Sequence, residues 1–122
     1  MATYVEINGS QYPAIIGGRI KDKDWNDRES KSIKIEMTYD QVKELFVDDV
    51  EWNILQEVEV QKEIINEETG EHTFETVIEL ESYDNSDFCV AGNITDHRDG
   101  TITVKMGKPT AEELLAMIEG VL

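Results

Sequence analysis

Residues 52–80 read WNILQEVEVQKEIINEETGEHTFETVIEL, and this stretch decides which kind of fold the chain adopts. Apolar side chains occupy even positions in both halves, and this period of two indicates β-strands. The tract between the halves contains Gly70, which suits the left-handed position of a three-residue loop at 68–70. We therefore predict one long antiparallel hairpin, in a register that places Ile64 opposite Phe74.

This register gives the hairpin, residues 51–83, an unusual arrangement of charge. It sets glutamate directly against glutamate, and facing like charges destabilise a strand pair by ~0.2–1 kcal/mol each. Two interpretations are open: a docking face for a basic protein or divalent cations, and a solvated face that keeps the hairpin from pairing with other chains. The facing pairs are Glu57 with Glu81, Glu59 with Glu79, Glu63 with Glu75, and Glu67 with Glu71.

Shorter signals place more strands on either side of this hairpin. Asn8-Gly9 predicts a type I′ turn near the start of the chain. A second turn at 98–100 joins predicted strands at 88–94 and 101–106. Alternating apolar residues at 33–37 predict one further strand.

Two helices are predicted at 39–47 and 110–121. Each follows a capping-box pattern, in which Thr38 or Thr110 precedes a Gln or Glu three residues later. The second helix carries one apolar stripe, which consists of Ala111, Leu114, Leu115, Ile118 and Leu122. Together the elements predict a single α+β domain over residues 1–122, an antiparallel sheet of six or seven strands with both helices packed on one face.

The charged tract at 21–32 is predicted to be a surface loop. Trp25 is its one aromatic residue, and it is either an anchor for a partner or a side chain that folds back onto its own core. Asp22–Asn26 copies three ligand positions of a calcium loop, but Asp27 and Ile33 stand where such a loop needs Gly and a bidentate Glu. We therefore expect a charged loop and no metal site.

Charge is concentrated in the middle of the chain. The protein has 27 acidic and 11 basic residues, a net charge of −16, and residues 48–87 hold fourteen of the acids but only one base. Such a field repels nucleic acids and anionic membranes and attracts basic protein surfaces. We expect a protein partner, either another copy of the chain or a different protein, and no direct binding of nucleic acid or membrane.

The sequence holds no pattern that predicts catalysis or a cofactor. Cys89 is the single cysteine, and neither it nor His72 or His97 has an activating group at a recognisable spacing. No apolar stretch reaches the ~18 residues of a membrane span, and Met1–Gln11 lacks the features of a signal peptide. We therefore expect a non-enzymatic protein that is not exported, with no catalytic, cofactor or metal residues. Its candidate interaction residues are Trp25, Glu57, Glu59, Glu63, Glu75, Glu79 and Glu81.

Three segments give the chain a resemblance to a known group of proteins. They are Tyr12–Arg19 (YPAIIGGR), Asp24–Ser30 (DWNDRES) and Asp96–Met106 (DHRDGTITVKM). The chain resembles the short acidic proteins that prophages of Gram-positive bacteria encode, typically among tail or baseplate genes. The resemblance implies a non-enzymatic structural or assembly role with phage structural proteins as partners, in the host cytoplasm or the virion.

An acidic inhibitor or DNA mimic that binds a basic, nucleic-acid-binding protein is the alternative function. Carboxylates on the predicted hairpin would stand roughly 4 Å apart along the strand, whereas duplex DNA carries one charge per ~1.7 Å. The lower charge density favours the assembly role over the mimic.

Overall fold

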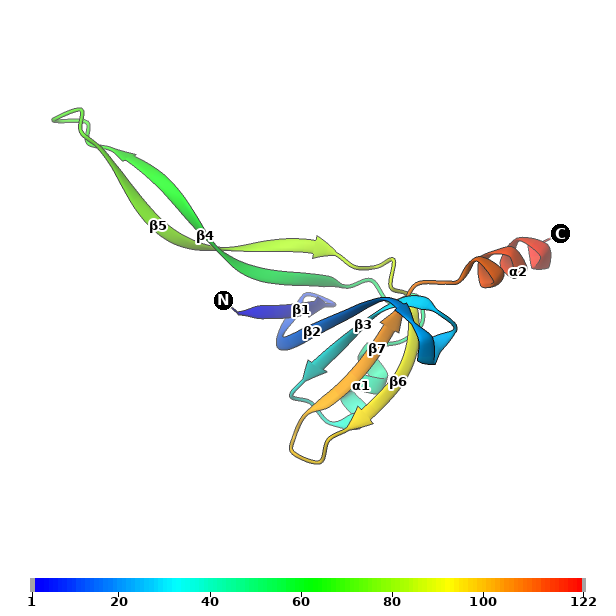
Figure 1. Cartoon of the computed structure of the whole chain (residues 1–122). Helices are drawn as coiled ribbons and strands as arrows, with labels where there is room; N and C mark the ends of the chain where they lie inside the picture. The colour runs from blue at the N-terminus through cyan, green and yellow to red at the C-terminus, as the bar shows by residue number, and fades with distance from the viewer. Residues whose placement is uncertain (1, 122) are drawn as a thin grey trace.

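Seven antiparallel strands pair in the order β5-β4-β1-β2-β3-β7-β6, and two helices complete the chain (Figure 1). The structure is a computed structural model that describes the backbone of residues 2–121 and the side chains of residues 2–118. It confirms the α+β class and the antiparallel sheet. The elements are β1 (Thr3–Ile7), β2 (Ser10–Asp22), the 3₁₀ turn η1 (Lys23–Trp25), β3 (Arg28–Ile35), α1 (Tyr39–Leu45), β4 (Asn53–Ile65), β5 (His72–Asp84), β6 (Val90–Asp96), β7 (Ile102–Gly107) and α2 (Ala111–Val121).

The hydrophobic core lies on the face of the sheet that α1 covers. Strands β3 and β7 send every second side chain to this face, and the paired residues Ile33 and Val104 are completely buried. Helix α1 packs against β6 and β7 and contributes Val42 and Phe46 to the core. The ring of Phe46 meets Trp52 edge-on at 6.2 Å, an arrangement that aromatic pairs prefer.

Local signals placed the first turn and the first helix correctly. Asn8 and Gly9 have φ values of +53° and +80°, as a type I′ turn requires. The hydroxyl of Thr38 accepts a hydrogen bond from the backbone of Gln41 at 3.2 Å, and the Gln41 side chain accepts one from the Thr38 N–H at 3.0 Å. This capping box starts α1, which ends at Leu45, two residues earlier than predicted.

The tract at 21–32 is mostly strand, so the prediction of a surface loop there was wrong. Strand β2 continues to Asp22 and β3 begins at Arg28, with η1 in the turn between them. The ladder between the two strands continues through this region, with one irregularity after Arg19. Three of its polar side chains, Asp22, Arg28 and Ser30, are buried in polar contacts, while the side chains of the turn between the strands are mostly exposed. The charge pattern alone does not distinguish such a tract from a solvated loop.

The register of the β4–β5 hairpin is shifted by one residue from the predicted one. Its loop has four residues rather than three, because the Asn66 N–H donates to the Glu71 carbonyl at 2.9 Å and the Gly70 N–H donates to the Asn66 carbonyl at 2.7 Å. The Asn66 side chain also accepts from the backbone of Glu68 at 3.0 Å, which builds the extra residue into the turn. Gly70 is left-handed as predicted, with φ of +69°, but none of the four glutamate pairs faces directly.

Helix α2 begins and ends close to the predicted positions but does not pack on the sheet. It projects from the body, on the side away from the β4–β5 hairpin (Figure 1). Its apolar side chains are exposed, up to 66% for Met117. Leu122, predicted to belong to its stripe, lies outside the described residues. Neither helix described in residues 2–121 has the length and the apolar run that a membrane span needs.

Candidate interaction site

The outer part of the β4–β5 hairpin, residues 58–79, forms an arm that leaves the body of the protein (Figure 1). Strand β4 pairs with β1 only as far as Gln56, and the Glu57 N–H makes the last bond to that side, 2.9 Å to the Ala2 carbonyl. From Val58 onward β4 pairs with β5 alone. The arm is therefore a two-stranded ribbon with open backbone edges, and such ribbons are only marginally stable by themselves in water.

The observed register mixes acidic and apolar side chains on both faces of the arm. Paired residues share a face, so odd positions of β4 lie beside even positions of β5. We call this side the Phe74 face; on it Glu63 lies opposite Phe74 and Glu59 lies opposite Ile78. The other side has Val58, Val60, Lys62, Ile64, Glu75, Val77 and Glu79.

Apolar side chains of the Phe74 face are open to solvent. Phe74 is 69% exposed and Ile78 is 56% exposed, and Ile65 near the tip is similarly open. The arm also holds seven acidic side chains and one lysine, a net charge of −6 with His72 neutral. Exposed aromatic and aliphatic groups gathered on one surface mark a candidate protein-binding site, and the negative charge around them favours a basic partner.

The predicted glutamates have separate partners instead of facing one another. Glu79 forms an ion pair with Lys62 at 2.7 Å, and Glu63 pairs with His72 across the arm. Glu75 lies directly opposite Lys62, whereas Glu59 has no ion pair or side-chain hydrogen bond within the described residues. At the base of the arm, Glu57 accepts from Tyr4 at 3.2 Å and Glu81 accepts from the hydroxyl of Tyr83.

These contacts shift the pKa values of the partner groups. The hydrogen bond to Glu79 raises the pKa of Lys62, because it stabilises the charged ammonium. Hydrogen bonds to Glu57 and Glu81 raise the pKa values of Tyr4 and Tyr83, because a second negative charge beside the carboxylate is unfavourable. The arm's carboxylates therefore act as acceptors for their own neighbours more than as a continuous negative ladder.

Trp25 folds back onto the sheet and is half-buried. Its ring lies over Gly92 of β6 and Gly107 of β7, where an added Cβ would come within 2.6 Å and 2.8 Å of ring atoms. The guanidinium carbon of Arg28 sits 4.4 Å from the centre of the ring, within cation–π range. Trp25 therefore packs on its own sheet but is not part of the hydrophobic core cluster. Its role as an anchor for a partner stays a prediction, and we leave it out of the interaction surface.

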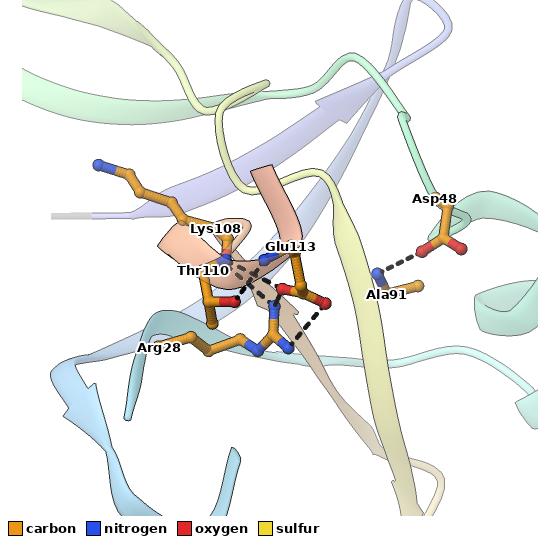
Figure 2. Close-up of polar contacts among 6 residues, drawn as sticks. All are labelled: Arg28, Asp48, Ala91, Lys108, Thr110 and Glu113. Atoms are coloured by element: carbon orange, nitrogen blue, oxygen red, sulfur yellow. Dashed lines mark hydrogen bonds and ion pairs between the residues drawn. The ribbon is translucent and has the colours of Figure 1, made fainter. Parts of the chain in front are cut away.

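Arg28 connects this cluster to α2 (Figure 2). Its guanidinium donates to both carboxylate oxygens of Glu113, at 2.7 and 3.3 Å, and to the carbonyl of Lys108 at 3.1 Å. Glu113 also accepts from the Thr110 N–H at 2.9 Å, while the Thr110 hydroxyl accepts from the Glu113 N–H at 3.2 Å, so the second capping box is present. The position of Arg28 therefore sets where α2 starts.

Asp22 is the centre of a second polar network. It is completely buried and accepts from the Lys105 ammonium at 2.9 Å, from the Ser30 hydroxyl at 3.0 Å and from the Asp24 N–H at 3.1 Å. The hydrogen bond from Lys105 is the main cause that lowers the pKa of Asp22, and burial opposes it. Asp22 thus serves as a structural acceptor, and its carboxylate and that of Asp24 both lie 3.6 Å from the same guanidinium nitrogen of Arg19.

The titratable groups of the turn between β6 and β7, which the sequence also places close together, are engaged in the structure of that turn. The carboxylates of Asp96 and Asp99 accept backbone hydrogen bonds within the turn between β6 and β7, at 2.8 and 3.0 Å. His97 lies 2.7 Å from the hydroxyl of Thr103. Across the part of the chain that the structure describes, no three His, Cys, Asp or Glu side chains are grouped so that they could hold a metal ion.

The sequence pattern missed the residues that hold the outer surface together. Asp22, Arg28, Lys105 and Glu113 are far apart along the chain, and their contacts depend on the pairing of β2, β3 and β7. One signal was available: glycines in two neighbouring strands leave room for a large side chain, and Gly92 and Gly107 do so for Trp25.

Comparison of the chain with protein-family models, with characterised proteins and with solved structures gives no match.

Proposed function

We propose that this chain is a non-enzymatic structural or assembly protein of phage origin that acts through protein–protein contacts of its arm. The observation that carries the proposal is the arm itself. It extends beyond the body with open edges and exposed apolar side chains, although every residue of the core cluster lies outside residues 58–79. A segment of 22 residues that adds nothing to its own core needs a role outside the chain.

The alternative, an acidic inhibitor or DNA mimic, is less well supported by the register. A mimic needs rows of carboxylates that replace phosphates, whereas the Phe74 face alternates glutamates with Phe74 and Ile78. Glu63 and Glu79 are also engaged by His72 and Lys62. An apolar and acidic surface favours a partner that buries side chains over one that recognises charge alone.

A genetic test addresses the assembly role directly. In the phage or prophage that encodes the chain, deletion of the gene should abolish complete particles in electron micrographs, and the wild-type gene should restore them. The variant Phe74→Ser with Ile78→Ser should fail to restore them, while the matched variant Tyr39→Ser with Val47→Ser, at exposed positions on α1 and just beyond it, should succeed. Normal particles without the gene would refute the proposal.

A further inference from the structure

The face of β2, β3 and β7 that points away from the core is covered by Trp25 and Arg28 at its Gly107 end and is open at its Ile15 end. Paired residues form three rows across these strands, and we call this surface the outer face. The rows are Ile15, Lys34 and Thr103; Gly17, Ser32 and Lys105; and Arg19, Ser30 and Gly107. Ile15 is 69% exposed, so the first row of the outer face presents an aliphatic group beside the amine of Lys34.

The outer face is hollowed where it is richest in hydrogen-bond donors. A pocket of about 230 Å³ is lined by Gly17, Arg19, Ser32 and Lys105, among others. Gly17 keeps it open, because a Cβ there would come within 2.7 Å of the Ser32 hydroxyl. A larger hollow of about 700 Å³, partly lined by Ile15 and Lys34, adjoins the same strands. Asp22 also lines the smaller pocket and already accepts from Lys105 and Ser30. The cation that remains beside an exposed aliphatic side chain is Lys34 next to Ile15, and this combination suits a carboxylate flanked by apolar groups.

The charges of the outer strands and of the arm are opposite. The three rows of the outer face hold three basic residues, Arg19, Lys34 and Lys105, and no acidic one. Arg19 and Lys105 are ion-paired with Asp22, so Lys34 is the base of these rows that has no ion pair within the described residues. The arm carries −6, so two arms repel each other, whereas an arm and an outer face attract. Glu59 and Lys34 are the clearest pair of this kind, since each lies beside an exposed isoleucine and neither has an ion pair within the described residues.

The arm of a chain is directed away from the outer face of the same chain. Strand β4 pairs with β1, and β1 separates it from β2, β3 and β7. The arm continues outward from β4, away from those three strands (Figure 1). Any arm that reaches an outer face therefore comes from another molecule. Because the two surfaces differ, each copy can bind one neighbour through its arm and a second neighbour through its outer face. Such head-to-tail contacts produce rings or filaments rather than closed dimers.

We propose that the Phe74 face of one copy's arm docks on the outer face of a second copy. The inference rests on the assembly role proposed above and names the partner of the arm as the chain itself. Glu59 of the arm meets Lys34, and Phe74 and Ile78 cover Ile15.

Charge reversal in the full-length protein tests this contact. Association is measured by sedimentation velocity at low and high salt for the wild type, Lys34→Glu, Glu59→Lys and the double variant. Matched controls are Lys43→Glu and Glu44→Lys, which make the same charge changes at exposed positions of α1. The wild type should assemble beyond a dimer and dissociate in salt. Each single change should weaken assembly by roughly tenfold, and the controls should not.

Restoration of assembly by a second charge change is the decisive result of this experiment. The double variant should regain assembly, because it again sets a lysine against a glutamate at this contact. An equimolar mixture of the two single variants should also regain it, because every contact between unlike variants pairs a glutamate with a lysine. An equal loss of assembly in Lys43→Glu and Glu44→Lys would overturn the proposed contact. Failure of the double variant or of the mixture to regain assembly would also overturn it. A wild type that stays monomeric at all salt concentrations would also overturn it, while the particle test above judges the assembly role separately. Particles that form normally without the gene would refute that role even if the purified protein assembles as expected.

Discussion

Arg28 is the residue with the widest influence on the structure outside the core. Its side chain is only 4% exposed, yet it contacts Trp25 by stacking and Glu113 through two hydrogen bonds. The buried guanidinium of Arg28 needs acceptors for its hydrogen bonds, and the half-exposed carboxylate of Glu113 supplies two of them. Through this pair the turn at η1 and the first turn of α2 are held together, although 85 residues separate them.

The Arg28–Glu113 pair predicts an acid-sensitive contribution to stability. The hydrogen bond from Arg28 is the main cause that lowers the pKa of Glu113 from 4.5 to about 2. Because the folded pKa is depressed, the stabilisation is complete above about pH 4.5 and is lost as pH falls toward 2. Glu113 is 45% exposed, so we expect Glu113→Gln to lower the free energy of unfolding by only about 1 kcal/mol at pH 7.

Urea unfolding of the wild type and Glu113→Gln between pH 7 and pH 2.5 checks this. The difference between the two should shrink below pH 4.5, and Glu112→Gln should follow the wild type throughout. Parallel pH profiles for the wild type and Glu113→Gln would show that the ion pair contributes nothing.

Gly92→Ala should be destabilising because of Trp25 alone. The three atoms nearest to the added Cβ all belong to the Trp25 ring, at 2.6–3.0 Å, and overpacking of this kind costs about 1–3 kcal/mol. Gly18→Ala is the control, since its nearest neighbour is 3.9 Å away. In a Trp25→Ala background the cost of Gly92→Ala should largely disappear in urea unfolding. If Gly92→Ala is equally destabilising without Trp25, then the backbone at position 92, and not the Trp25 ring, is the reason that a glycine is needed there.

At the scale of an element, the arm differs from every other strand pair in having no face on the core. Elsewhere one face of each strand is buried, and a shift of one residue would expose core side chains. In the arm neither register would bury a side chain in the core, so the length of the loop determines the register. The hydrogen bonds of Asn66 add one residue to this loop and thereby shift the pairing by one residue. Glutamates and apolar residues consequently share both faces.

The observed register predicts that Glu59 and Glu79 act independently. They lie on opposite faces, with Glu59 opposite Ile78 and Glu79 paired with Lys62. We expect Glu59→Gln to be nearly neutral, and Glu79→Gln to destabilise the arm by less than about 0.5 kcal/mol, with additive effects in the double variant. Amide hydrogen exchange within the arm, at low salt, measures its opening free energy. Stabilisation by each change, with strong coupling between them, would instead indicate facing glutamates.

The whole molecule consists of a folded body from which the arm and α2 project on different sides (Figure 1). The body contains the complete core cluster, and its strands are braced by the buried networks around Asp22 and Arg28. The arm and α2 instead expose apolar surface that the body does not use. Such a division allows contacts with other molecules to change without a change in the fold.

Removal of the arm should therefore leave the body folded. Glu57 and Leu80 already lie opposite each other, so Asn-Gly in place of residues 58–79 closes a two-residue turn between them. We expect the free energy of unfolding to stay within about 1 kcal/mol of the wild type, because no core residue is lost. Thermal and urea unfolding of the shortened protein measure this. A loss of several kcal/mol would show that the arm belongs to the cooperative unit.

The sequence by itself determined the features that depend on near neighbours. Alternation specified strands, Asn8-Gly9 specified a tight turn, and the Thr38 and Thr110 capping boxes specified helix starts, because the interacting groups are only a few residues apart. The class of the sheet followed from these elements, as did the acidic and partly apolar character of the hairpin.

Only the tertiary structure decided which of these surfaces are free. The exposure of the α2 stripe, the burial of Asp22 and Arg28, and the fit of Trp25 over Gly92 depend on residues brought together from distant strands. The register of the arm also could not be derived from its hydrophobic pattern, since that pattern selects a register only where one face is buried. The arm buries neither face, and its pairing therefore followed the hydrogen bonds of its loop.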